Sequence, residues 1–197
     1  MSTDARREKE VFLVFLRKIY GEVATQRSFK DEFPDCVRPD EFKGRPFFEN
    51  LNQIWVSLTK YRGYSELVGV RTKRLPGCDY YLPEQSRIIE FDERQHFSIP
   101  RKISLQMYPE GLELGFDRLR YISLCEDIKA IDNDKNVPHR DEQRAWLDTL
   151  RDFLPLIYGL KPTIRIYSKD FNWRMLNPDN LAHIEDFKRL LTQRCTA

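Results

Sequence analysis

Residues 78–92 constrain the fold of this chain more than any other segment. Residues 78–82 and 87–92 are rich in aromatic and β-branched side chains, which is typical of β-strands. The four residues between them, 83–86, begin with proline and are few enough to form the turn of a hairpin. We therefore predict two antiparallel strands that belong to a central sheet.

Further helical and strand patterns surround this hairpin. Apolar residues at helical spacing predict helices over about 5–20, 46–61, 140–154 and from about 177 onward, with two more helices within 97–139. Strands are predicted at 67–70 and 163–167, and the latter can join the sheet in parallel through a helical crossover. The fold class is therefore α/β, with a mixed central sheet flanked by helices and a helical insertion at about 97–139.

Residues 22–46 show no regular pattern, because Pro34, Pro39, Gly44 and Pro46 interrupt it. We expect an N-terminal helix and an irregular linker over 1–45, followed by the main domain over 46–197. Ser98 and Asp117 are expected to cap the two helices of the insertion.

Composition excludes several classes of protein. Hydrophobic residues make up 41% of the 197 residues and aromatic residues 13%, which a disordered chain would not reach. The net charge of +2 excludes a strongly polybasic protein. No apolar run approaches the ~18–20 residues of a membrane span, and residues 11–16 lack the features of a secretion signal. We expect a cytoplasmic protein with no membrane partner and with free cysteines.

Three carboxylates lie on the predicted hairpin. Glu90 and Asp92 point to the same face of their strand because side chains alternate, and the turn brings Asp79 close to them. Carboxylates that converge repel one another, and a divalent cation with oxygen ligands relieves this repulsion. The predicted cofactor is therefore Mg²⁺ or Mn²⁺, which can activate water against a phosphodiester. Gln95 and His96 follow directly and are placed to orient that water.

This segment resembles the PD-(D/E)xK nuclease superfamily, and within it the very-short-patch-repair-endonuclease-like branch of small bacterial proteins. The residues that carry the resemblance in register are Asp79, Tyr80, Tyr81, Pro83, Ile89, Glu90, Asp92 and His96. It continues more weakly in Ile54-Trp55-x-x-Leu58 and in Asp141-x-x-Arg144-x-x-Leu147, so that it covers about 47–167 except the insertion.

The resemblance implies a restriction-endonuclease-like fold and metal-dependent hydrolysis of phosphodiester bonds in DNA. The implied catalytic residues are Asp79, Glu90, Asp92, Gln95 and His96, and the first three of them would hold the metal. The sequence departs from the family pattern at Asp92, which stands in the place of the usual lysine, and at Glu93, which stands in the place of a glycine.

Basic residues flank the acidic segment and are the predicted contacts to nucleic acid, because neutralised phosphates supply most of the affinity for DNA. These residues are Lys73, Arg74, Arg94, Arg101, Lys102 and Arg144. An alternative is a binding module of the same fold that holds nucleic acid or a protein. Such a module would be catalytically weak or inactive because it lacks the usual lysine. A third hypothesis is an interaction protein that uses its helical insertion and binds no metal. The sequence leaves open whether the protein forms a homodimer.

Overall fold

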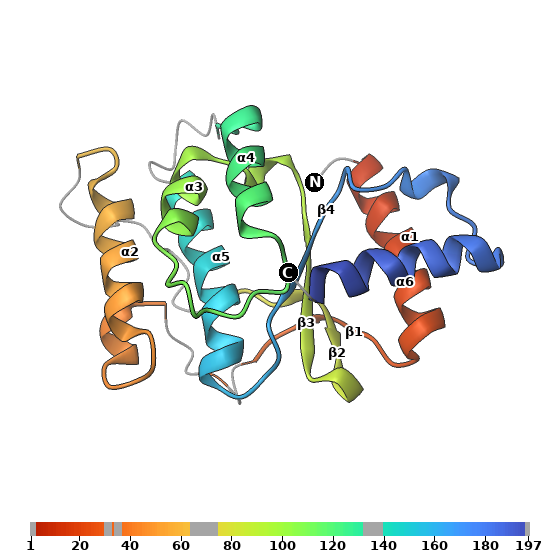
Figure 1. The fold of residues 1–197 in the computed structure, drawn as a ribbon, viewed down its shortest axis with the longest axis horizontal. Helices are drawn as coiled ribbons and strands as arrows, with labels where there is room; N and C mark the ends of the chain where they lie inside the picture. Colours follow the sequence, from red (N-terminus) through yellow and green to blue (C-terminus); the bar gives the residue numbers. More distant parts are fainter. Residues whose placement is uncertain (1–2, 30–32, 34–36, 64–74, 132–139, 196–197) are drawn as a thin grey trace.

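A mixed four-stranded sheet runs through the middle of the computed structural model, with helices on both of its faces (Figure 1). The structure describes residues 3–29, 33, 37–63, 75–131 and 140–195. The strands follow the order β1 (Ala24–Arg27), β2 (Cys78–Leu82), β3 (Arg87–Asp92) and β4 (Ile164–Tyr167) across the sheet. Within the described residues the fold is α/β with six α-helices, as the sequence predicts.

The predicted hairpin and parallel strand are both present. β2 and β3 are antiparallel, with Tyr80 opposite Ile89, and a short 3-10 turn over Pro83–Gln85 joins them. β4 lies parallel to β3 and follows the crossover helix α5 (Arg140–Ile157). α5 runs through Pro155, where the predicted helix ends. The Arg151 carbonyl, which proline cannot bond, accepts instead from the Thr163 hydroxyl at 2.7 Å.

The sheet separates two hydrophobic cores. One face packs against α1 (Thr3–Tyr20) and α6 (Leu181–Cys195), which lie together on one side in Figure 1. The other face packs against α2 (Phe48–Lys60), α3 (Ile99–Gln106), α4 (Arg118–Ile128) and α5. Alternation along β3 supplies both cores, because Ile88 points to the second face while Ile89 and Phe91 point to the first.

The insertion forms two capped helices, as predicted. The Ser98 hydroxyl accepts from the backbone N–H of Arg101 at the start of α3, and the Asp117 carboxylate accepts from that of Arg120 at the start of α4. Both helices therefore begin where their capping residues predict. Within the described residues, no helix combines the length and apolar character that crossing a membrane requires.

The structure corrects the prediction of an irregular linker over 22–46. Residues 24–27 form β1, an edge strand that pairs with β2, and α1 buries Phe12, Phe15 and Leu16 against the same sheet. β1 escapes sequence analysis because it is four residues long and two of them are exposed, so backbone pairing rather than apolar alternation defines it. β1 and the later strands thus share one sheet, and α1 packs on it. The strand predicted at 67–70 lies outside the described residues.

Candidate functional site

The three carboxylates predicted to share a site instead meet three different basic side chains. Asp79 accepts from Lys9 Nζ at 2.8 and 2.9 Å, and Lys9 belongs to α1. Glu90 forms an ion pair with Arg151 Nε at 2.7 Å, and Arg151 belongs to α5. Because α1 and α5 lie on opposite faces of the sheet, Asp79 and Glu90 are directed to opposite sides (Figure 1).

The alternation of side chains along β2 fails at Asp79, and this explains the difference from the prediction. Cys78 and Tyr81 both contribute to the core on the α5 face, although strict alternation would place them on opposite faces. Gln26, the residue of β1 beside Asp79, has a positive φ of 52°. The β2–β3 register begins at the pair Tyr80–Ile89, and beyond it the backbone N–H of Phe91 donates to the side chain of Asp79 at 3.0 Å.

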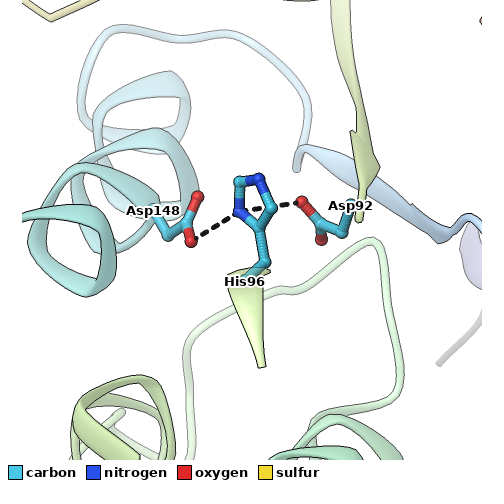
Figure 2. A group of neighbouring side chains, drawn as sticks. All are labelled: Asp92, His96 and Asp148. Carbon is cyan, nitrogen blue, oxygen red and sulfur yellow. Dashed lines mark hydrogen bonds and ion pairs between the residues drawn. The ribbon is translucent and has the colours of Figure 1, made fainter. Parts of the chain in front are cut away.

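A different acidic group forms at the end of β3. His96 lies between Asp92 and Asp148, and its Nδ1 atom is 2.9 Å from Asp148 Oδ2 and 3.5 Å from Asp92 Oδ1 (Figure 2). One ligand atom from each of the three residues lies within 4.8 Å of the others. This group could hold a metal ion. Both dashed lines in Figure 2 start from the same ring nitrogen of His96.

Three separate elements bring this group together. Asp92 is the last residue of β3, His96 ends the 3-10 turn Arg94–His96, and Asp148 comes from the middle of α5. Sequence analysis found the first two and missed Asp148. A signal for it exists, because Asp148 and Asp152 are four residues apart on a helix that is otherwise buried, and Arg165 interrupts an apolar strand.

Arg165 organises the carboxylates around this group. Its guanidinium is fully buried and contacts Asp92 at 2.9 and 3.1 Å, Asp152 at 2.7 Å and Asp148 at 3.4 Å. Arg101 binds Asp152 from the other side at 2.7 Å. Two guanidinium groups thus face three buried carboxylates, and His96 would balance the third negative charge in its protonated form.

The charges of this network shift the titration of its members. Burial alone would lower the pKa of His96, but Asp148 and Asp92 outweigh it, so that this pKa lies above its ordinary value of 6.5. Burial opposes ionisation of Asp148, yet His96 and Arg165 hold the pKa of Asp148 well below its usual range. On the hairpin, burial raises the pKa of Glu90 to about 7 against the opposing charge of Arg151.

The predicted contacts to nucleic acid fall into four groups. Lys73 and Arg74 lie outside the described residues. The prediction that Arg101 contacts nucleic acid is wrong, because its side chain is 2% exposed and bonded to Asp152, so that a phosphate cannot reach it. Lys102 pairs with Glu126 at 2.7 Å, and Arg144 donates to the backbone carbonyl of Gln95 at 3.2 Å. Arg94 is exposed.

A cavity of about 850 Å³ opens beside the group, where β3 and β4 end. Arg94 and Gln95 line it together with residues that follow β4, including Lys169, Phe171 and Arg174. Of the predicted site residues, the structure therefore unites Asp92 and His96 and places Gln95 in the neighbouring cavity. Asp79 and Glu90 stay in ion pairs of their own.

No match was found when the chain was compared with models of protein families, with curated proteins and with solved structures. The interpretation of the site therefore rests on its own chemistry. Two carboxylates and an imidazole nitrogen can ligate a divalent ion, and a histidine oriented through Nδ1 by an aspartate can exchange protons through Nε2.

Proposed function

We propose that the protein is a metal-dependent endonuclease that hydrolyses phosphodiester bonds in DNA, and that Asp92, His96 and Asp148 hold its metal ion. The observation that carries the proposal is the convergence of their three ligand atoms within 4.8 Å at the end of β3. The mixed sheet, in which a helix precedes the parallel strand β4, is compatible with the restriction-endonuclease-like fold that the resemblance implies.

The donor set favours Mn²⁺ over Mg²⁺, because Mg²⁺ prefers oxygen ligands while Mn²⁺ accepts an imidazole nitrogen more readily. Bound there, the ion would polarise a phosphodiester oxygen and lower the pKa of a water molecule. Arg165 contacts Asp92 and Asp148 and fixes their orientation, and its charge helps to hold the pKa of Asp148 below its usual range. His96 Nδ1 faces both carboxylates, so a proton and a metal ion compete for this atom.

Nicking of supercoiled plasmid in Mn²⁺ or Mg²⁺ tests the proposal. Wild-type protein should nick the plasmid only with metal, and Asp148→Asn should lower the rate at least about 100-fold, beyond the 10–100-fold typical of outer-shell partners. Asp127→Asn on α4 is the matched control, because Asp127 is exposed and does not belong to the group. It should cut at the wild-type rate. Metal-dependent nicking that is the same in Asp148→Asn would contradict the proposed site.

A second pair of variants separates this site from the hairpin. If Asp79→Asn and Glu90→Gln abolish nicking while Asp148→Asn does not, the metal ion lies on the hairpin, as the sequence predicts. If Asp148→Asn abolishes it and the hairpin variants only weaken it, the end of β3 holds the ion. Circular dichroism of each variant establishes that it is folded.

The alternative is a nucleic-acid-binding module without catalysis, and one observation favours it. Each hairpin carboxylate already has a basic partner at 2.7–2.9 Å, namely Lys9 for Asp79, Arg151 for Glu90 and Arg165 for Asp92. Such a module would bind DNA with a strong dependence on salt. It would show neither nicking nor heat of Mn²⁺ binding in calorimetry.

A further inference from the structure

The cavity beside the candidate metal group lies at the carboxyl ends of two parallel strands. Tyr167 of β4 is the register partner of Asp92 on β3, and the backbone N–H of Ser168 donates to the Asp92 carbonyl at 2.9 Å. β3 and β4 both end here, and the residues that follow each strand line the cavity. In open α/β sheets this is the edge at which ligands bind. A volume of about 850 Å³ suits a ligand larger than a single ion.

The charge of the cavity favours an anion. Its lining carries two acidic residues, Glu8 and Glu93, against three basic ones, Arg94, Lys169 and Arg174. Lys169 is 3.6 Å from Glu8, and the side chains of Arg94 and Arg174 are exposed. A phosphate group entering the cavity therefore meets a net positive wall.

Two aromatic rings on the lining are held in place by their neighbours. Phe171 packs on Trp173, with ring centroids 5.6 Å apart, and Trp173 is itself buried and donates to the Ser168 carbonyl at 2.7 Å. Tyr167 packs edge-on against Phe97 at 4.6 Å. Both rings stay half-buried and keep part of their surface toward the cavity. Fixed aromatic surface beside basic groups is the combination that binds a nucleobase with its phosphate.

We propose that this cavity receives one unpaired nucleotide of a nucleic acid, with its base against Phe171 and Tyr167 and its phosphate against Arg94 and Arg174. A base within a duplex is covered on both faces by its neighbours, so only a single strand, an end or an extruded nucleotide can enter. The inference rests on the proposed function in naming its substrate class, since Gln95 in the cavity adjoins His96 in the metal group.

Binding in EDTA tests the inference without any cleavage. The probe is a fluorescein-labelled strand of five thymidines, and fluorescence anisotropy measures its displacement by the unlabelled strand and by relaxed, covalently closed circular duplex DNA, which has no ends, at equal phosphate concentration. The wild-type protein should bind the single strand at least tenfold more tightly. Phe171→Leu should weaken this binding about tenfold, in line with the loss of one stacked base. Phe171→Tyr, which retains a ring, should bind like the wild type.

The double variant Arg94→Gln/Arg174→Gln should lower the slope of log affinity against log salt by about 0.7 for each phosphate that is no longer neutralised. Arg17→Gln on α1 is the matched control, because Arg17 is exposed and does not line the cavity. It should change neither affinity nor slope. Equal affinity for strand and duplex, or wild-type binding by both Phe171→Leu and the arginine double variant, would overturn the inference.

The two proposals fail separately. If the protein binds the single strand through these residues but never cuts DNA, the nucleotide site is supported and the nuclease proposal is wrong. If it nicks DNA through Asp148 while Phe171→Leu binds and cuts normally, the nuclease proposal is supported and the nucleotide site is wrong.

Discussion

The two faces of the sheet are stabilised in different ways. Toward α1 and α6 the contact is mainly apolar apart from the Lys9–Asp79 ion pair, and the ring of Phe12 lies within 5.1–5.3 Å of those of Tyr80, Phe91, Trp173 and Phe187. Toward α5, the end of the sheet instead buries the guanidinium of Arg165 among Asp92, Asp148 and Asp152. Aromatic packing stabilises a fold directly, whereas buried ion pairs recover little more than their own desolvation.

This contrast indicates what each face contributes. An apolar layer like that around Phe12 would stabilise the second face at least as well as the charges do. The buried guanidinium of Arg165 therefore fixes the positions of Asp92 and Asp148 rather than adding stability. Removal of one charged residue from this network should leave a buried charge unpaired and lower the free energy of unfolding.

Removal of Arg165 should have the largest effect. Arg165→Ala leaves three buried carboxylates with too few cations, and we expect the free energy of unfolding to fall by roughly 3–5 kcal/mol. Urea denaturation measures this change. Arg165→Lys should recover only part of it, because an ammonium group cannot reproduce the forked contacts with Asp92 and Asp152. A loss below about 1 kcal/mol in Arg165→Ala would show that the network is well solvated.

A change on the apolar face should be smaller and of a different kind. Phe12→Leu keeps most of the buried volume and should lower the free energy of unfolding by about 1–2 kcal/mol, because leucine cannot pack against the four rings as phenylalanine does. Phe12 lies in the apolar core on the far side of the sheet from the charged network, so this decrease should be the same at pH 5 and pH 8. A pH-dependent decrease in this variant would show that the two faces are coupled.

The contrast between the faces also decides what could be predicted from the sequence. The hairpin and the caps at Ser98 and Asp117 depend on neighbours along the chain, and the apolar residues of β4 mark it as a strand, so the structure has each of these predicted elements. The partnership of His96 with Asp148 joins residues 52 positions apart. No local pattern encodes that distance, so Asp148 emerges only when α5 is packed on the sheet.

The position of Asp79 follows the same reasoning. The rule that strand side chains alternate is local, and it places Asp79 with Glu90 and Asp92. The rule fails where β1 lies beside β2, because Gln26 adopts a left-handed conformation next to Asp79. β1 itself could not be predicted, so neither could its effect on Asp79. The sequence thus identifies the acidic segment but cannot tell which of its members act together.

The smallest of these effects concerns the titration of His96. Its pKa in the folded protein lies above the ordinary 6.5 because Asp148 and Asp92 favour the charged ring despite burial. The resulting stability is fully present below pH 6.5 and is lost as the pH rises through the higher pKa of the folded state. Between those limits the wild-type protein should become less stable with rising pH. His96→Gln should remove that part of the slope.

Measured in EDTA, the difference between wild type and His96→Gln isolates the imidazole from any bound metal. His183→Gln is the matched control, since its ring accepts from the backbone N–H of Asn177 at an exposed site remote from the network. This control should keep the wild-type slope. Glu90, whose pKa burial raises to about 7, contributes a slope of the same sign that both proteins share. If the slope in His96→Gln equals that of the wild type, the charge balance described for the face toward α5 is incorrect. If the slope decreases in His96→Gln and not in His183→Gln, protonated His96 is the cation that completes this buried network.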